Sequence, residues 1–249
     1  MRSGFLRSKN FKSRVFTGVI LGVLSVASLF TPNAFLFRII FAVGCGMAIL
    51  ELYVAHRHRV NSCLIIADDR ILVFEYAIII VASYAVCTQL TVLDIWFVLV
   101  GAIAADTFAY LIGSAMHGLF FISRPFPITS PKKSWEGIIG GGFASILILL
   151  GMLIFTEQRM ASAASQQVRT ESLVFVILCP CFSVFGDYLA SFCKRLLSIK
   201  DSNECIMESN LIVPKVMEKF MSGHGGYLDR IDSITMVSCL MLLLRIGET

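Results

Sequence analysis

The chain has 249 residues, a formal net charge of +4 and a mean hydropathy of +0.80, and only 15% of its residues are charged while 57% are hydrophobic. So few polar groups cannot cover a soluble globule of this size, which excludes a water-soluble enzyme or binding domain. The composition therefore predicts an integral membrane protein that has the lipid bilayer as a partner. We expect no nucleic-acid partner.

Seven apolar runs approach the roughly 20 residues that a helix needs to cross a bilayer. They cover residues 15–30, 34–55, 71–87, 93–116, 137–155, 172–193 and 233–246, of which the first and the last are the shortest. We predict an all-α, polytopic membrane protein with about seven transmembrane helices in a single domain, 1–249. Within it, residues 1–105 supply N-terminal membrane helices, residues 106–233 the motif-bearing region and residues 234–249 the last helix.

The first apolar run has two interpretations. Basic residues as far as Arg14 precede it, as they do in a cleaved signal peptide. A second apolar run follows almost directly after residues 31–33, and no cleavage site stands out. We therefore favour an uncleaved first transmembrane helix.

Lysine and arginine positions predict the orientation of the chain in the membrane. Seventeen of the 21 fall in the N-terminal segment and in alternate loops, whereas the other loops and the C-terminal tail hold three, and Arg38 lies within a predicted span. Loops rich in Lys and Arg stay in the cytoplasm. This distribution predicts a cytoplasmic N-terminus, and it places the loops 117–136 and 194–232 on the cytoplasmic face.

Glu51, Glu75, Asp106 and Asp187 all fall inside predicted spans. An ionised acid at the centre of a membrane helix costs about 2.5–3.5 kcal/mol, so each of them needs a partner or a use. Glu51 and Glu75 have no comparable polar neighbours on their helices, which favours a structural role for these two.

The other two acids share helix faces with polar residues. Tyr110 follows Asp106 by four residues, and Ser191 and Lys194 follow Asp187 by four and seven, so each set lies on one face. This pattern favours a functional role for Asp106 and Asp187, with Tyr110 supporting Asp106. A snorkelling or ion-paired structural acid is the alternative.

A second polar cluster lies at the end of the loop 117–136. It reads Ser130-Pro131-Lys132-Lys133-Ser134-Trp135-Glu136-Gly137, and three further glycines follow at 140–142. Its lysines offer point charges for phosphate, and the glycines allow close helix packing or approach of the backbone to a ligand. A positive-inside anchor with a tryptophan in the interfacial belt explains the residues equally well. Residue chemistry alone leaves the two interpretations open.

A third cluster combines cations and carboxylates of the loop 194–232 with Asp187 of the preceding span. It consists of Lys194, Arg195, Lys200, Arg230, Asp187, Asp201, Asp229 and Asp232, together with His224 among the glycines 223, 225 and 226. Balanced charge of this density suits a polyphosphate with a divalent metal, because cations meet phosphate oxygens and carboxylates hold Mg²⁺. The role of the histidine as acid, base or hydrogen-bond donor stays open.

These clusters resemble those of the phosphatidate cytidylyltransferase (CDP-diacylglycerol synthase) family. The resemblance rests on the run 130–137, Gly186-Asp187, Lys194-Arg195, Lys200-Asp201-Ser202, the segment from His224 to Asp232, and the Asp106 face. It covers roughly residues 106–233, and the ordered combination of motifs is highly specific. It implies transfer of CMP from CTP to phosphatidic acid, which yields CDP-diacylglycerol and pyrophosphate for phospholipid synthesis.

The resemblance also implies the components of the reaction. CTP and phosphatidic acid are the expected substrates and Mg²⁺ the expected cofactor, with a monovalent cation as a second candidate. The implied assembly is a homodimer. The implied location is the bacterial inner membrane, with the active site facing the cytoplasm.

Within this framework each candidate residue receives a role. The metal ligands are Asp187, Asp201, Asp229 and Asp232. The catalytic set is Asp201, His224, Asp229, Arg230 and Asp232. The substrate-binding set is Ser130, Lys132, Lys133, Glu136, Ser191, Lys194, Arg195, Lys200, Gly225 and Gly226, and the supporting residues within the membrane are Asp106 and Tyr110.

The chain departs from the family pattern at a few positions. Residues 203–221 intervene between the Lys-Asp pair and the glycine-rich loop, Ser222 and Ser114 replace a proline and an arginine, and Phe108 replaces a common glycine. We favour a tolerated surface loop for the insertion, because lengthening such a loop costs little entropy. The alternative is that the insertion separates Asp201 from the other acids.

Three other functions compete with this one. A related CTP-dependent enzyme acting on another lipid, such as a polyprenol or phytol kinase, shares parts of the pattern. An ion-coupled transporter would explain the buried acids but leaves the glycines and paired charges of the loops unexplained. A non-catalytic scaffold is suggested only by the insertion. The dense aspartate-rich motif of CDP-alcohol phosphatidyltransferases does not occur in this sequence.

Overall fold

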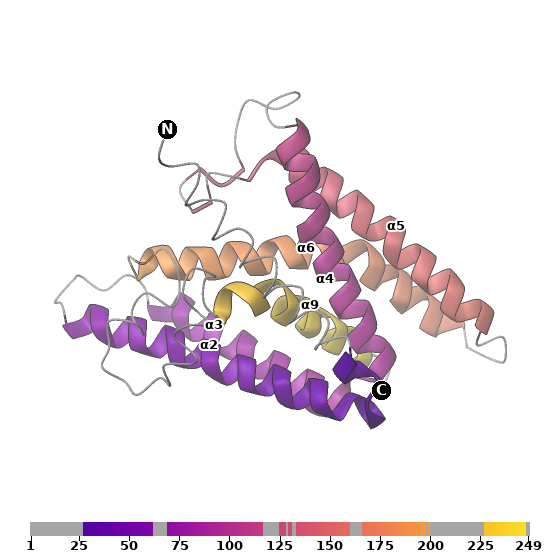
Figure 1. The fold of residues 1–249 in the computed structure, drawn as a ribbon, viewed down its shortest axis with the longest axis horizontal. Helices are drawn as coiled ribbons and strands as arrows, with labels where there is room; N and C mark the ends of the chain where they lie inside the picture. Colours follow the sequence, from indigo (N-terminus) through magenta and orange to yellow (C-terminus); the bar gives the residue numbers. More distant parts are fainter. Residues whose placement is uncertain are drawn as a thin grey trace. The chain divides into compact units, whose positions relative to one another are not determined.

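The computed structural model describes residues 27–61, 69–116, 125–127, 129, 130, 133–159, 166–197, 199 and 227–247. Within these ranges all the regular secondary structure is helical (Figure 1). The helices are α2 (Phe35–Asn61), α3 (Asp69–Tyr84), α4 (Val92–Met116), α5 (Trp135–Arg159), α6 (Gln166–Leu196) and α9 (Leu228–Ile246), and short η1 (Pro32–Ala34) and η2 (Ala85–Gln89) flank α2 and α3. The prediction of an all-α fold is confirmed for this part of the chain.

Five of these helical segments are long and apolar enough to cross a membrane. They are Pro32–Arg57, Arg70–Gln89, Val92–Met116, Trp135–Thr156 and Ser172–Leu196. Each coincides with one of the seven predicted runs, which confirms a polytopic helical membrane protein. Most of the first predicted run, 15–30, lies outside the described residues. The total of seven spans and the cytoplasmic N-terminus remain predictions.

Helix α9 covers the last predicted run but differs in character from the five spans. Its 19 residues include four charged ones, namely Asp229, Arg230, Asp232 and Arg245. Three of these four lie within the first five residues of the helix, so its apolar part is confined to the remainder. The helix therefore joins a charged segment to an apolar one.

The chain divides into two compact units. One consists of residues 1–67 and 196–230, and the other of residues 68–195 and 231–249. The second unit contains α3, α4, α5, almost all of α6 and the larger part of α9. The first contains α2 and the start of α9. The single domain predicted from the sequence remains a prediction.

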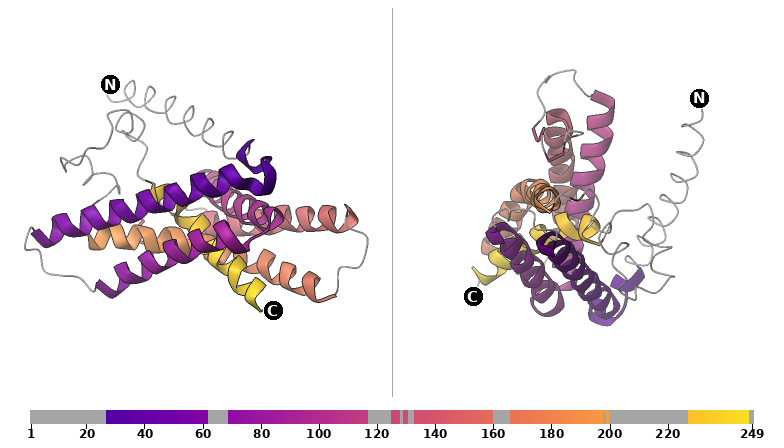
Figure 2. Two further views of the ribbon diagram at one scale, coloured as in Figure 1. Left: turned by 90° about the horizontal axis from the view of Figure 1, so that it is seen from below. Right: turned by 90° about the vertical axis from the view of Figure 1, so that its left-hand side faces the viewer.

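Helices α4 and α5 pack along one another in the second unit (Figures 1 and 2). Glycines make this contact possible, because a Cβ built on Gly141 would lie 2.5 Å from the Ala109 nitrogen and one built on Gly137 would lie 2.6 Å from the Ala109 carbonyl oxygen. The Ser145 hydroxyl donates a hydrogen bond of 3.0 Å to the Gly101 carbonyl between the same two helices. Close packing between membrane helices depends on small residues in this way.

Replacement of Gly141 by alanine is therefore expected to destabilise the fold. The new methyl group would meet backbone atoms of α4, which cannot rotate aside, and overpacking of this kind costs about 1–3 kcal/mol. Gly142→Ala is the matched control, because a Cβ there makes an ordinary 3.5 Å contact with Pro180. Thermal unfolding in detergent should show a lower midpoint for Gly141→Ala alone. Equal midpoints for the two variants would contradict the packing described above.

The C-terminal end of α9 is tied to the beginning of α4. Arg245 forms an ion pair with Asp94 at 2.5 Å, and the second Asp94 oxygen accepts a 2.9 Å hydrogen bond from the Thr91 backbone N–H. Asp94 is buried, so the arginine gives a partner to an acid that would otherwise lack one in an apolar environment. This contact fixes one end of α9 within the second unit.

Candidate active site

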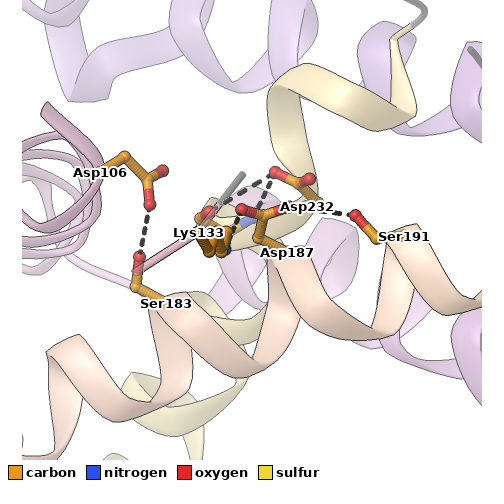
Figure 3. A network of polar contacts seen from close by, with 7 residues as sticks. Asp106, Lys133, Ser183, Asp187, Ser191 and Asp232 are labelled. Atoms are coloured by element: carbon orange, nitrogen blue, oxygen red, sulfur yellow. Dashed lines mark hydrogen bonds and ion pairs between the residues drawn. The ribbon is translucent and has the colours of Figure 1, made fainter. Parts of the chain in front are cut away.

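Asp187 and Lys133 form an ion pair that joins two separate motifs. Asp187 lies on α6, and Lys133 lies two residues before α5 begins. Both side chains are partly buried, with 29% and 25% of their surfaces exposed. Ser191 donates a 3.3 Å hydrogen bond to Asp187 from one turn further along α6, as the predicted common face requires. The structure thus brings the second and third polar clusters of the sequence together (Figure 3).

Asp232 adds a second carboxylate from α9. Only 8% of this residue is exposed, and its Oδ1 accepts a 2.7 Å hydrogen bond from the Ser233 backbone N–H. Burial, and then the negative charge of Asp187, raise the pKa of the Asp232 carboxyl well above its usual range. Two acids that influence one another in this way favour a cation between them.

Gly186 makes this approach of α9 to α6 possible. A Cβ built at Gly186 would lie 2.5 Å from the Asp232 carbonyl oxygen and 2.9 Å from the Met236 Cβ. Beside this contact, Ile78, Leu189 and Met236 form a buried apolar cluster that joins α3, α6 and α9. The Gly-Asp pair of the sequence therefore has two functions, close helix contact and placement of a carboxylate beside it.

Asp106 brings a third carboxylate from α4. Its Oδ1 accepts a 3.3 Å hydrogen bond from the Ser183 hydroxyl of α6, and its side chain is also hydrogen-bonded to Ser233 of α9. The charges of Asp187 and Lys133 lie near enough to act on it. Figure 3 shows Lys133 between Asp106 and Asp187, with Asp232 beside Asp187. Three helices thus contribute one acid each to this group, and Lys133 acts on two of the three.

Lys194 supplies a second cation to this group. Only 8% of the residue is exposed, and its charge acts on Asp232 and on Glu75 of α3. Glu75 is itself buried. Glu75 therefore interacts with the charge of Lys194 and is also packed in the interior. The sequence favoured a structural role for Glu75, because Lys194 comes from a helix far away in the chain and is no neighbour of Glu75 on its own helix.

The segment that precedes Lys133 is fastened along α6. The ring of Phe126 lies 4.6 Å from that of Tyr188, which in turn stacks on Phe192 at 6.1 Å. Further along, the Arg195 guanidinium Nε donates a 3.4 Å hydrogen bond to the Thr129 carbonyl. With the ion pair of Lys133, the loop contacts α6 at three points. These contacts hold Phe126, Thr129 and Lys133 against the carboxylate-bearing helix.

The remaining candidate residues fall into four groups. Ser130 lies in the turn of this loop, where its N–H donates a 3.1 Å hydrogen bond to the Phe126 carbonyl, and Glu136 is buried at the start of α5. Tyr110 is 73% exposed, and its supporting role remains a prediction. Asp229 and Arg230 lie in the first turn of α9. The following candidates lie outside the described residues: Lys132, Lys200, Asp201, His224, Gly225 and Gly226.

The acids fit a hard divalent cation in their chemistry. Carboxylate oxygens are the protein ligands that Mg²⁺ prefers. A cation between Asp187 and Asp232 would oppose both the burial and the repulsion from Asp187 that raise the pKa of Asp232. In the described ranges, no three acidic, histidine or cysteine side chains are close enough to form a metal cluster. Asp201, the remaining predicted ligand, lies outside those ranges.

Sequence reasoning missed two kinds of contact, one at the site of the second unit and one within the first unit. Ser183 and Ser233 bind the Asp106 carboxylate, and Glu51 hydrogen-bonds to the backbone of Tyr227 and Leu228. Small hydroxyl residues are too common in membrane helices to be singled out. The signal for Glu51 was present as the cost of a buried acid, but its partners are backbone groups, which no sequence motif marks.

Helices that are long and apolar enough to span a membrane thus carry carboxylates and lysines that converge at one place in the second unit. Residues 69–208 match the sequence model of the Cytidylyltransferase family, and the chain belongs to this family. The matched region includes Asp106, Lys133, Asp187 and Lys194. Asp232 lies beyond its C-terminal limit.

Curated relatives carry names that agree with the family. The chain is 37% identical over 142 residues to "Phosphatidate cytidylyltransferase 5, chloroplastic" of Arabidopsis thaliana, a match over 56% of this chain and 28% of the relative. It is 32% identical over 131 residues to the phosphatidate cytidylyltransferase of Haemophilus influenzae, over 50% and 39% of the two chains. For that of Staphylococcus aureus (strain COL) the identity is 34% over 143 residues, over 57% and 44%. The match thus spans less than half the length of each of these relatives.

Proposed function

We propose that this protein transfers CMP from CTP to phosphatidic acid and forms CDP-diacylglycerol and pyrophosphate. The observation that carries the proposal is the junction of Lys133 with Asp187, because it unites two motifs of the cytidylyltransferase region in one partly buried site. The names of the relatives support phosphatidate as the acceptor. The membrane helices support a lipid substrate.

In the proposed reaction a phosphate oxygen of phosphatidic acid attacks the α-phosphorus of CTP. The bond from this phosphorus to the oxygen that bridges to the β-phosphate breaks, and pyrophosphate leaves. Both reactants are anions, so the site must bring like charges together and neutralise the leaving group. Mg²⁺, when bound, supplies positive charge to the phosphate oxygens during this transfer.

The residues of the chain provide the positioning. Asp187 and Asp232 offer carboxylate oxygens for the metal, and Asp106 adds a further negative charge near Asp187. Lys133 pairs with Asp187 and the charge of Lys194 acts on Asp232, so phosphate oxygens would compete with these carboxylates for the two lysines. Arg195 holds the Thr129 carbonyl and so keeps the loop of Lys133 in place.

Location and assembly belong to the same proposal. We place the site at the cytoplasmic face, because the distribution of lysines and arginines puts both motif-bearing loops there. The family resemblance suggests a bacterial inner-membrane location and a homodimer. An opening between helices would admit the acyl chains sideways from the bilayer.

A double-label assay tests the proposed activity. Purified protein in detergent is incubated with phosphatidic acid, Mg²⁺ and CTP labelled at either the α- or the γ-phosphorus, and lipid-extractable label is measured. The transfer of CMP should place α-label in the lipid and release γ-label as pyrophosphate. A lipid kinase would give the reverse distribution, and the absence of label in the lipid from both nucleotides would overturn the proposal.

A further inference from the structure

Glu51 is a fully buried acid near the C-terminal end of a membrane-crossing segment. It lies on α2 within the candidate span Pro32–Arg57, and 0% of the residue is exposed. An ionised carboxylate in such a position is costly unless hydrogen bonds compensate the loss of water. The partners of this side chain therefore indicate why the acid is there.

Both carboxylate oxygens accept hydrogen bonds from the beginning of α9. The Tyr227 N–H donates to Oε1 at 2.8 Å, and the Leu228 N–H donates to Oε2 at 3.0 Å. The first N–H groups of a helix have no partner within the helix, and a negative charge there also interacts favourably with the helix dipole. Hydrogen bonds from N–H groups to an ionised acceptor are among the stronger ones in proteins. Glu51 thus caps α9 from a position 176 residues earlier in the chain.

The two capped peptide groups occupy a sensitive place in the sequence. They lie directly after the glycine-rich segment 223–226 and directly before Asp229 and Arg230, and the same helix carries Asp232 one turn after Leu228. The Glu51 carboxylate gives the N–H groups of Tyr227 and Leu228 an acceptor that the helix itself does not supply.

We propose that Glu51 is a positioning residue of the active site. Its carboxylate fixes the N-terminus of α9 and thereby sets where the first turn of this helix presents Asp229 and Arg230. The inference rests on the proposed cytidylyltransferase function for its effect on activity, but the contact itself is independent of that function. Glu51 acts through the backbone and does not touch the reacting atoms.

The test compares Glu51→Ala and Glu51→Gln with Asp94→Ala. Asp94 is a suitable control, because it is also a buried acid in a membrane-crossing helix, and it secures the opposite end of α9 through Arg245. Per folded molecule, Glu51→Ala should lower kcat for CMP transfer by about 10-fold or more and raise the Mg²⁺ concentration for half-maximal rate, as the loss of a supporting contact does at metal sites. Glu51→Gln keeps one acceptor oxygen, so its kcat and its Mg²⁺ concentration for half-maximal rate should lie between those of Glu51→Ala and the wild type.

Hydrogen–deuterium exchange provides a readout that does not depend on activity. The amides of Tyr227 and Leu228 should be protected in the wild type and should exchange at least about 10-fold faster in Glu51→Ala, while those of α4 and α5 stay unchanged. Wild-type protein that transfers no CMP but shows this protection would overturn the proposed function alone. Unchanged exchange of these amides in Glu51→Ala would overturn the positioning role. The same holds if both Glu51 variants have the kcat and the Mg²⁺ dependence of Asp94→Ala.

Discussion

Asp187→Asn is expected to reduce the formation of CDP-diacylglycerol by about 100-fold or more, the loss that follows removal of one electrostatic group from an active site. Asparagine has the same shape as aspartate, so α6 and its packing should persist. The charge that pairs with Lys133 and repels Asp232 disappears. If the site depends on this carboxylate to hold Mg²⁺, the asparagine amide cannot replace it, because the amide has only one acceptor oxygen and no charge.

The measurement is an initial rate over a Mg²⁺ titration, normalised to the folded protein. Asp94→Asn is the control, because it removes a buried acid of α4 that pairs with Arg245 instead of with the site. The rate of Asp94→Asn per folded molecule should stay within about twofold of the wild type, since the substitution leaves the Lys133–Asp187 pair in place. If Asp187→Asn retained a third or more of the wild-type rate at every Mg²⁺ concentration, Asp187 would have no place in the metal site.

Gly186→Ala should impair both the stability and the activity. The added Cβ would lie 2.5 Å from the Asp232 carbonyl oxygen, a backbone atom, so α9 must move away from α6. Overpacking of this kind costs about 1–3 kcal/mol. Because Asp232 moves with the backbone, the activity of the remaining folded protein should fall by about 100-fold, as expected for a misplacement of about 1 Å.

Gly151→Ala provides the matched comparison on a neighbouring helix. A Cβ there would have no atom within 4 Å, and alanine in a helix is favoured over glycine by roughly 0.5–1 kcal/mol. This variant should match or exceed the wild type in thermal midpoint and retain its rate. Equal behaviour of Gly186→Ala and Gly151→Ala would show that the close approach of α9 to α6 is not needed.

The helices themselves were largely predictable. Five apolar runs of the sequence coincide with membrane-crossing helices, because an apolar run of bilayer length has no better way to satisfy its backbone than an α-helix. The contact between Asp187 and Ser191 was predictable as well, since residues four apart lie on one face of a helix. In the same way, the polar residues at the start of α9 could be recognised as a charged group.

Contacts between helices were not predictable from these patterns. The glycines at 140–142 were compatible with packing or with ligand approach, and the structure shows that Gly141 meets the backbone of α4 while Gly142 makes only an ordinary contact. The same limit applies to Tyr110, which follows Asp106 at helical spacing and yet is 73% exposed. Spacing predicts which residues share a face, but not which neighbour the face meets.

By itself, the sequence determined that this is a helical membrane protein with clusters of acids and cations that suit a phosphate-bearing substrate. Both conclusions follow from hydropathy, helical periodicity and side-chain charge, which can be determined from residues that are neighbours in the sequence. Only the tertiary structure decided that Lys133 pairs with Asp187, that Asp232 approaches Asp187 across Gly186, and that Glu51 caps α9. These contacts depend on which helix faces meet, and their partners are distant residues or backbone groups that carry no mark in the sequence.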